Sequence, residues 1–392
     1  MPALWTYPWN LAAEGPDNAC EAIAARGIDA INLASHYHSV RSMNPRTPEN
    51  LFERHSGGCY FDPGESAFDD TPIDPRPIPV DGMDDPLFEL VGTAAEHGLD
   101  VNAWTVCLHN TALGAAHPEY RIESAFGDAH DHAFCPSNPE VRNYFADVVA
   151  AISDRGVAEI QLESVGFQSA FHEHGAEFGH DKRQTITTTT EEVLLSQCFC
   201  DGCRNAARDH PVDMESAQES VRGMVRSSFD HPDEEPPSID SLDALVNENE
   251  TLHELFDFRA EVVTEFVGGL AAASDVPLNY YAMEAHTGVE PGSGWPAGVE
   301  LSRLEPSLDR ITAICYVVDP SVARERIRAF RRTVDRPLDV GVTLDPSIIE
   351  SQAQLHDLVS AIRDETDGEV FVYHHGLMTE TQLEWVETAF SR

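Results

Sequence analysis

Basic side chains are scarce in this sequence of 392 residues, where Lys182 is the only lysine. Lysine and arginine together number 25, against 68 aspartate and glutamate residues, and the formal net charge is −43. A surface this acidic repels nucleic acid and anionic membranes, which excludes both as partners. It also repels itself at low ionic strength, whereas molar salt shortens the screening length to roughly 3 Å. The charge therefore predicts a protein from a salt-loaded cytoplasm, as in halophilic archaea.

Long apolar stretches are also missing from the chain. No run approaches the roughly 20 apolar residues that a membrane-spanning helix needs. The first residues, MPALWTYPWN, have neither the basic start nor the apolar core of a signal peptide. We therefore expect a soluble cytoplasmic protein whose partner is a small molecule or an oligosaccharide.

Three of the eight cysteines crowd into six positions, as Cys198, Cys200 and Cys203. Thiolates packed this closely repel each other or oxidise unless a soft cation binds them, and zinc binds four such ligands tetrahedrally. Cys135, directly ahead of a helical pattern, is the candidate fourth ligand. A zinc ion with four cysteine ligands is coordinatively closed, so this site would be structural and the chemistry would lie elsewhere. The competing interpretation is one disulfide and two inert thiols, which a reducing cytoplasm disfavours.

Short apolar runs alternate with helical patterns along the chain. The apolar runs predict strands at Leu4–Trp9, Ile28–Ser35, Asp100–Cys107, Ala158–Glu163, Pro277–Met283, Ile311–Val317, Leu338–Leu344 and Val370–His374. Glycine closes the preceding helix at Gly27, Gly98, Gly156 and Gly368, as expected of a helix C-cap. These strand-then-helix units predict a (β/α)8 TIM barrel, here a single domain over residues 1–392. The main competitor is an open doubly wound sheet, but no glycine-rich phosphate-binding turn follows the first strand.

Long insertions follow strands two, three and four of the predicted barrel. The first occupies residues 39–85, and the insertion after strand four occupies residues 164–254 and contains the cysteine cluster. All of them follow the C-terminal end of a strand, which is the catalytic face of such a barrel. We therefore expect the insertions to wall the substrate pocket.

Aromatic and histidine side chains follow the predicted strands at the ends that share the barrel mouth. Aromatic faces stack on sugar rings, and imidazole and amide groups bind hydroxyls, so the set predicts carbohydrate binding. The candidate substrate-binding residues are Trp9, Asn10, His36, His38, Trp104, His109, Tyr316, Tyr373, His374 and His375, with His172, Glu173 and His174 in the loop after strand four.

Glu163 ends a strand that should be buried, where an unpaired carboxylate is costly unless it is used. We therefore predict that Glu163 is catalytic. Glycoside hydrolysis needs a second group on the opposite side of the sugar. Asp345 after strand seven and Glu284 after strand five are equal candidates for that group, and Glu173 ranks third.

The cysteine motif resembles that of a known enzyme family. Residues 198–203 read CFCDGC, and Cys135 opens the segment CPSNPEVR. Both segments resemble those of family 42 β-galactosidases, which are TIM-barrel enzymes of glycoside hydrolase clan A with a structural zinc beside the fourth βα unit. The resemblance implies that Cys135, Cys198, Cys200 and Cys203 bind this zinc, and that Glu163 corresponds to the acid/base carboxylate.

Two positions depart from the clan A pattern. Clan A members have asparagine directly before the acid/base glutamate, where this chain has Leu162, and a glutamate nucleophile after strand seven, where it has Asp345. The segments LESVGF (162–167), FHEHG (171–175) and YHHGLM (373–378) also resemble a group of haloarchaeal glycosidase-like barrel proteins. The resemblance thus implies a remote glycosidase-like protein rather than galactosidase activity.

Several functions are compatible with these residues. The leading hypothesis is carboxylate acid/base catalysis on a saccharide, with Glu163 as the proton donor. A metal-dependent enzyme of the sugar isomerase or amidohydrolase kind would instead bind its metal with His36, His38 and Glu163, together with His172 or His174, because alternate residues on a strand share a face. The remaining alternative is a barrel that binds carbohydrate without cleaving it.

Overall fold

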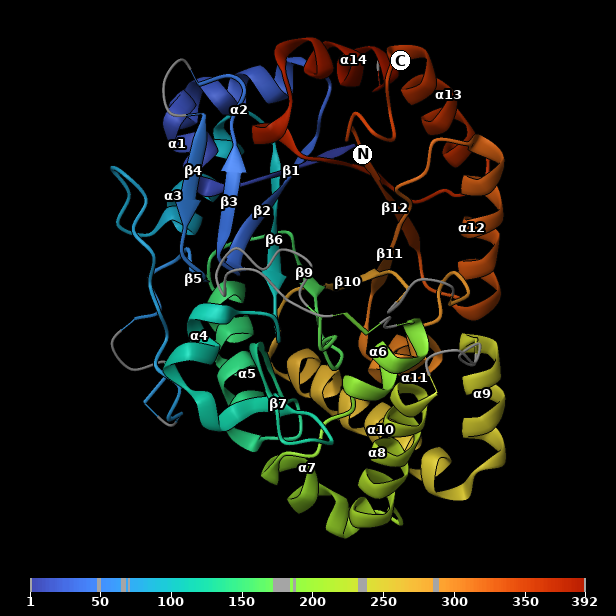
Figure 1. The fold of residues 1–392 in the computed structure, drawn as a ribbon. Coiled ribbons are helices and arrows are strands. Elements are labelled where there is room, and N and C mark those ends of the chain that lie inside the picture. Colours follow the sequence, from blue (N-terminus) through green and yellow to red (C-terminus); the bar gives the residue numbers. More distant parts are fainter. Residues whose placement is uncertain are drawn as a thin grey trace.

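Eight parallel strands form a closed barrel in the computed structural model, which describes residues 2–47, 51–64, 68–69, 71–171, 184–185, 188–231, 238–284 and 289–390. In order around the ring they are β1 (Ala3–Thr6), β2 (Ala30–Tyr37), β6 (Asp100–Val106), β9 (Glu159–Glu163), β10 (Leu278–Ala282), β11 (Arg310–Ile314), β12 (Leu338–Thr343) and β13 (Val370–Tyr373). Strand β1 pairs with both β2 and β13, which closes the ring (Figure 1). The predicted (β/α)8 barrel is confirmed.

Helices cover the outside of the ring (Figure 1). They are α1 (Pro8–Glu14), α2 (Pro16–Ala25), α3 (Pro86–Glu96), α5 (Pro139–Ser153), α10 (Glu250–Ala273), α11 (Leu301–Leu304), α12 (Pro320–Thr333), α13 (Gln352–Arg363) and α14 (Glu380–Phe390). Proline opens several of them, at a position where its missing N–H would have no partner in any case. Asp85 caps α3 by accepting a hydrogen bond from the Phe88 N–H at 3.1 Å. None of the helices in these described ranges is both long enough and apolar enough to cross a bilayer.

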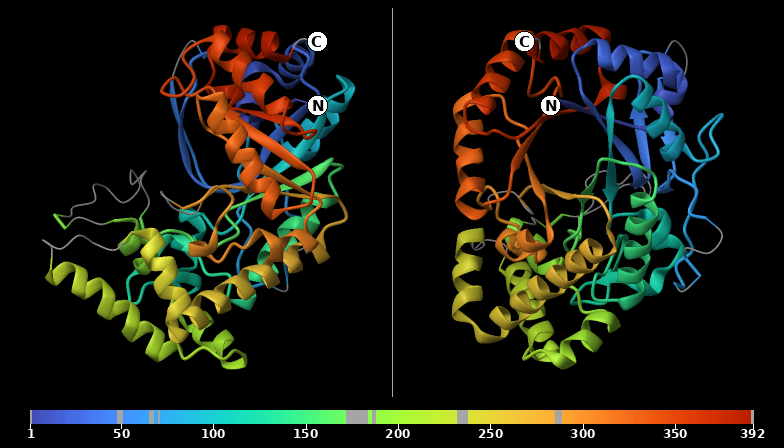
Figure 2. Two further views of the ribbon diagram at one scale, coloured as in Figure 1. Left: turned by 90° about the vertical axis from the view of Figure 1, so that its right-hand side faces the viewer. Right: turned by 180° about the vertical axis from the view of Figure 1, so that it is seen from behind.

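The insertions build elements of their own. Those after β2 are β3 (Val40–Met43), β4 (Phe52–His55) and β5 (Gly58–Cys59). Those after β6 are α4 (Thr111–Ala116), η1 (Pro118–Tyr120), β7 (Arg121–Glu123) and β8 (Ala129–Phe134). Those after β9 are α6 (Thr189–Leu195), α7 (Asp201–Ala206), η2 (Ala207–Asp209), α8 (Met214–Asp230) and α9 (Ile239–Glu248), and Figure 2 shows α8 and α9 extending beyond the ring on one side.

Side chains on the strands alternate between the barrel interior and the layer beneath the helices. Ile160 and Leu162 of β9 are fully buried in the large core that joins the strands to the helices. Trp5 of β1 and Trp104 of β6 belong to a separate core that fills the interior of the ring. Glu163 directly follows Leu162, so its side chain faces the interior.

The interior is polar toward the N-terminal ends of the strands. Asp339 of β12 accepts hydrogen bonds from Arg310 Nε at 2.8 Å and from Asn279 Nδ2 at 3.1 Å. Asn279 also donates to Glu159 at 3.1 Å, and Gln161 donates to Glu159 at 2.6 Å. Buried polar groups are stable when they are bonded in this way, so this end of the barrel is a packed base.

Two predicted strand ends lie three residues too far along the chain. The sixth strand was expected to reach Val317, but β11 ends at Ile314. The first strand was expected to reach Trp9, but β1 ends at Thr6 and α1 begins at Pro8. Proline has no N–H to give to a strand ladder, and its fixed φ suits the first turn of a helix. Trp9 therefore lies on a short helix at the mouth and not on the strand.

Three of the four predicted glycine caps have the left-handed backbone that the prediction requires. Gly27, Gly98 and Gly156 have φ values of 75°, 73° and 76°. Gly368 is needed for a different reason, because a Cβ there would lie 1.9 Å from the carbonyl oxygen of Leu338. At Gly368, glycine permits two backbone segments to approach closely.

Candidate active site

Glu163 lies at the mouth of the barrel as the last residue of β9. It pairs across the sheet with Val106 of β6, so Trp104 lies one inward-facing position earlier on the neighbouring strand. Trp104 Nε1 donates a hydrogen bond to Glu163 Oε2 at 2.6 Å. Because Trp104 is only 4% exposed, the carboxyl group is held against a ring that is itself fixed by packing.

Three tyrosine hydroxyls meet beside Trp104. Tyr7 Oη lies 3.2 Å from Tyr37 Oη and 3.3 Å from Tyr373 Oη. The Tyr7 ring is parallel to Trp104 to within 17°, with ring centroids 6.0 Å apart, and Tyr37 meets Trp104 edge-on at 4.6 Å. Strands β13, β1 and β2 are neighbours in the ring, which brings these distant parts of the sequence together. We call Tyr7, Tyr37 and Tyr373 the tyrosine cluster.

Sequence reasoning missed Tyr7 and Tyr37. The pairing of β2 with β6 shifts by one residue between Ala34 and His36, and such a bulge reverses the inward and outward alternation. Ala34 and Tyr37 therefore both belong to the interior core. Nothing in the local sequence marks this bulge, so simple alternation placed His36 inward in place of Tyr37.

The position of His36 corrects its predicted place in the mouth. Its Nδ1 is 2.6 Å from the carbonyl oxygen of Val106, and its Nε2 is 3.3 Å from Tyr144 Oη of α5. Burial lowers the pKa of His36 to about 4, so the ring is neutral. His36 is fully buried and packs between the barrel and α5.

Burial is the main influence on the ionisation of Glu163. It raises the pKa of this carboxyl, and the hydrogen bond from Trp104 opposes the rise only in part. In the described part of the chain, no cation lowers this pKa. Burial also raises the pKa of each hydroxyl in the tyrosine cluster, so these groups are neutral. A carboxyl that keeps its proton toward neutral pH is suited to act as a general acid.

The two favoured partners of Glu163 are engaged elsewhere. Glu284, after β10, forms an ion pair with Arg326 of α12. Asp345, after β12, is exposed and accepts hydrogen bonds from the N–H and the hydroxyl of Ser347 at 2.8 and 2.6 Å. These bonds lower the pKa of Asp345 and favour its charged form. Neither carboxylate acts on the pKa of Glu163.

Two predicted histidines come together at the mouth. The His38 ring stacks on Tyr37 at a centroid distance of 4.2 Å and on His109 at 5.0 Å. His109 meets His132 of β8 edge-on at 5.5 Å. The sequence prediction omitted His132 because it lies in an insertion rather than at a barrel strand. Outside the described residues lie three further candidates, His172, Glu173 and His174.

Aromatic rings extend the tyrosine cluster on both sides. Trp9 stacks on Tyr7 at 4.3 Å, and the His374 ring lies 3.9 Å from Tyr7. Burial lowers the pKa of His374 well below its ordinary value, so this ring is neutral as well. Tyr316 is 38% exposed, with its ring 6.2 Å from that of Tyr373. The structure therefore brings these predicted residues into one largely uncharged surface.

Asn10 and His375 are as buried as Tyr7 and Tyr37 and are closely packed. Asn10 is 4% exposed, and a Cβ at Gly376 would lie 1.9 Å from its Oδ1. His375 is 3% exposed, its carbonyl oxygen accepts a hydrogen bond from Arg46 at 2.5 Å, and burial lowers its pKa to about 3. Their surroundings are those of packing residues that support the mouth.

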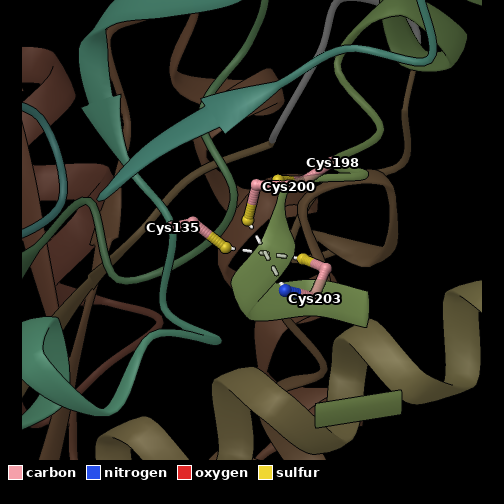
Figure 3. A group of neighbouring side chains, drawn as sticks. All are labelled: Cys135, Cys198, Cys200 and Cys203. Carbon is pink, nitrogen blue, oxygen red and sulfur yellow. Dashed lines mark hydrogen bonds between the residues drawn. The ribbon is translucent and has the colours of Figure 1, made fainter. Parts of the chain in front are cut away.

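Four cysteine thiols converge beside the barrel (Figure 3). Cys135 follows β8, Cys198 and Cys200 precede α7, and Cys203 lies within α7. The sulfur atoms all lie within 4.8 Å of one another, and all four side chains are buried. None of the eight cysteines is in a disulfide, so the alternative of one disulfide and two inert thiols is wrong. A tetrahedral zinc with Zn–S bonds of about 2.3 Å holds its sulfurs roughly 3.8 Å apart, and the thiols fit such an ion.

Backbone groups also support the thiols. The N–H of Cys203 points to Cys200 Sγ at 3.5 Å, and the N–H of Glu123 points to Cys198 Sγ at 3.4 Å. A Cβ at Gly202 would lie 2.3 Å from Asn138 Oδ1, so glycine allows α7 to approach the segment after Cys135. Donors of this kind orient thiolate ligands and stabilise their charge.

No protein-family model matches this sequence, and no curated protein is significantly similar to it. Solved structures do resemble it. A β-galactosidase from the psychrophilic Marinomonas ef1 is 11% identical, with a TM-score of 0.58 over 100% of this chain and 59% of that chain. The α-L-fucosidase isoenzyme 2 from Paenibacillus thiaminolyticus is 11% identical, with a TM-score of 0.53 over 96% of this chain and 45% of that chain. This chain thus spans about half the length of these proteins, and the likeness establishes the fold alone.

Proposed function

We propose that this protein is a glycosidase-like enzyme in which Glu163 protonates the glycosidic oxygen of the leaving group. The observation that carries the proposal is the state of Glu163, a carboxyl with a raised pKa that receives one neutral hydrogen bond inside an aromatic mouth. Retaining and inverting glycosidases both need a protonated carboxyl beside the bond that breaks, and a raised pKa favours that form. The similar solved structures, a β-galactosidase and an α-L-fucosidase, support a saccharide as substrate.

The surface around Glu163 suits a neutral saccharide. The tyrosine cluster supplies hydroxyl donors and acceptors, and Trp104 adds an aromatic ring beside Glu163. A sugar acid would bring a negative charge into a mouth where, among the described residues, no cation acts on Glu163, which disfavours its binding. We expect uncharged glycosides to be better substrates than uronides.

The test is turnover by a matched pair of amide variants. Glu163→Gln keeps the shape and the hydrogen bond from Trp104 but has no proton to give, so hydrolysis of aryl glycosides should fall by about 100-fold or more. The same change at Glu284, which is paired with Arg326, should leave turnover unchanged. Far-UV circular dichroism and sugar binding should be unaffected in both variants. Full activity of Glu163→Gln would remove the proposal.

A barrel that binds saccharide without cleaving it is the second candidate, and one observation favours it. Two of the predicted candidates for the second carboxylate lie in the described part of the chain. Glu284 is paired with Arg326, and Asp345 accepts hydrogen bonds from Ser347. Glu173 stays a prediction, tested by Glu173→Gln. If the wild-type protein binds oligosaccharides by calorimetry but cleaves no glycoside in a broad panel, the binding function is the correct one.

We also propose that Cys135, Cys198, Cys200 and Cys203 hold a structural zinc ion. Four buried thiols with backbone donors match the coordination that zinc prefers, and four protein ligands leave no open position for substrate. Zinc would tie the insertion after β6 to the insertion after β9. Metal analysis of the purified protein should give one zinc per chain, and Cys200→Ser should lose it. A second bound metal would favour the isomerase or amidohydrolase alternative.

A further inference from the structure

Ser164, the residue directly after Glu163, has a strained backbone. Its φ is 57°, and among the residues that the structure describes it is the only one other than glycine with a positive φ. In this left-handed conformation the Cβ of an L-residue lies too close to the following carbonyl oxygen, so glycine is the usual choice. Strain of this kind persists only where the surrounding structure fixes it, and it gathers at active sites.

Hydrogen bonds fix the chain on the strand side of this turn. The N–H of Cys107 donates to the carbonyl oxygen of Glu163 at 2.9 Å, and the N–H of Leu108 donates to that of Ser164 at 2.9 Å. Pairing between the two segments therefore continues one residue past the ends of β6 and β9. The carbonyl groups before and after the Ser164 Cα are thus both held in place.

Packing fixes the chain on the other side of the turn. Val165 is fully buried in the large core, and the N–H of Phe167 donates to the carbonyl oxygen of Ala297 at 2.9 Å. A Cβ at Gly166 would lie 2.9 Å from the same oxygen, so the two segments are in close contact. Because the strand and the loop are both fixed, Ser164 has to make the turn between them.

The turn matters to Glu163 because the two residues share a peptide bond. The carbonyl group of Glu163 is attached to the same Cα as its side chain, so a different φ at Ser164 would rotate this peptide group and redirect the carboxyl. That carboxyl makes a specific contact, since Oε2 accepts a hydrogen bond from Trp104 Nε1 at 2.6 Å. Trp104 is only 4% exposed and cannot follow, so a redirected carboxyl would lose the bond.

We propose that Ser164 is a positioning residue for the Glu163 carboxyl, and that its left-handed turn holds Glu163 Oε2 against Trp104. The inference rests on the role proposed above for Glu163 and extends it to a residue that acts through Glu163 and not on the substrate. Glycine would permit the same turn without strain, but it adopts positive and negative φ about equally readily. Once the flanking chain selects a positive φ, serine is confined to the small left-handed region, which keeps the carboxyl in one orientation.

The experiment compares the wild type with three variants of the full chain. Ser164→Val introduces a β-branched side chain, which is excluded from the left-handed region more strongly than serine, and Ser164→Gly removes the Cβ that confines the turn. Gly27→Val is the matched control. Gly27 has a φ of 75°, and a Cβ there would meet no described atom within 4 Å, so this change imposes similar backbone strain at the other end of the barrel. Both valine variants should unfold at a lower temperature than the wild type.

The first measurement follows the indole N–H of Trp104 by NMR in protein labelled at tryptophan, with Trp104→Phe to identify the signal. In the wild type its chemical shift should change as Glu163 ionises, and Glu163→Gln should abolish that change. We expect Ser164→Val to lose most of the change and Gly27→Val to keep it, although both are destabilised. If Ser164→Val keeps the full change, Ser164 has a structural role alone and the inference is wrong.

The second measurement is turnover of an aryl glycoside. Glu163 acts on the breaking bond, so misplacing its carboxyl should lower kcat with little change in KM. We expect kcat to fall by about 100-fold in Ser164→Val and by about 10-fold in Ser164→Gly, and to stay unchanged in Gly27→Val. If Ser164→Val does not fold, a wild-type kcat and a wild-type indole titration in Ser164→Gly would contradict the inference. Full activity of Glu163→Gln would instead remove the proposed function, and the indole measurement would still decide whether Ser164 holds the carboxyl.

Discussion

The two ends of the barrel interior compensate a buried carboxyl group to different degrees. At the base, the Asp339 side chain is fully buried and surrounded by donors: Arg310, Asn279 and the N–H of Glu369, the last at 2.7 Å. At the mouth, the hydrogen bond that the described residues give to the Glu163 carboxyl comes from the neutral indole of Trp104. Burial raises the pKa of both carboxyls. At Asp339 the hydrogen bond and charge of Arg310 and the hydrogen bond from Asn279 oppose this rise, whereas at Glu163 the described group that opposes it is Trp104.

This difference distinguishes a carboxyl group that stabilises the fold from one that is a candidate for catalysis. Asp339 raises the pKa of Arg310, which keeps the guanidinium charged and the base of the barrel bonded together. Burial raises the pKa of Glu163, and among the described residues Trp104 is the group that opposes the rise. Groups that are poorly compensated in a concave site are candidates for chemistry, whereas compensated ones hold the fold. Substituting each carboxyl by its amide tests this distinction directly.

The largest expected effect on stability is at the base. Asp339→Asn removes the negative charge that pairs with Arg310 and breaks a network of buried hydrogen bonds. We expect a loss of about 2 to 4 kcal/mol in the free energy of unfolding, measured by denaturant titration. The control is Glu380→Gln, since Glu380 pairs with Arg26 at a position where its side chain is 60% exposed and should contribute less than about 0.5 kcal/mol. If the two variants lose the same free energy of unfolding, the buried Asp339–Arg310 pair contributes no more to stability than an exposed ion pair.

A smaller effect is expected from the one hydrogen bond at the mouth. Trp104→Phe keeps a ring beside Tyr7 but removes the N–H that stabilises the charged form of Glu163. The pKa of Glu163 should therefore rise further, and because the general acid must be protonated, the alkaline fall in activity should move to higher pH. Loss of positioning should also lower turnover by about 5- to 10-fold. The pH dependence of kcat/KM measures both effects, and an alkaline limb that stays in place or moves to lower pH would contradict the role given to Trp104.

Much of this architecture could be read from the sequence. Apolar runs bounded by glycine and proline predict the strands, because a buried parallel strand and its preceding helix leave clear local marks. The cysteine cluster was equally visible, since thiols at Cys198, Cys200 and Cys203 in six positions leave few alternatives. These features depend on neighbours along the chain, and local sequence specifies them.

The mouth was harder to predict because it depends on register between strands. Because the register shifts between Ala34 and His36, Tyr37 faces the barrel interior where alternation predicts His36. No residue type in the sequence marks that shift. Asp345 followed a strand as expected, but its turn with Ser347 leaves it exposed. The predicted strand ends therefore locate the mouth of the barrel. Which way each side chain points depends on the register between neighbouring strands, and the sequence alone does not specify that register.

The smallest predicted effect concerns stability at the mouth, where replacing the carboxyl by its amide should have the opposite effect to the same change at the base. Because the pKa of Glu163 is raised in the folded protein, folding favours the protonated carboxyl, and the stability present at acid pH is lost as pH rises through the folded pKa. Glu163→Gln cannot ionise and does not show this loss. Relative to the wild type, the variant should therefore gain stability between acid and neutral pH, by about 1 kcal/mol or less. Unfolding measured at both pH values tests this, with Asp339→Asn as the comparison that is destabilised at neutral pH. If Glu163→Gln loses stability at neutral pH as Asp339→Asn does, Glu163 is a compensated structural carboxylate and the distinction between the two ends of the barrel is lost.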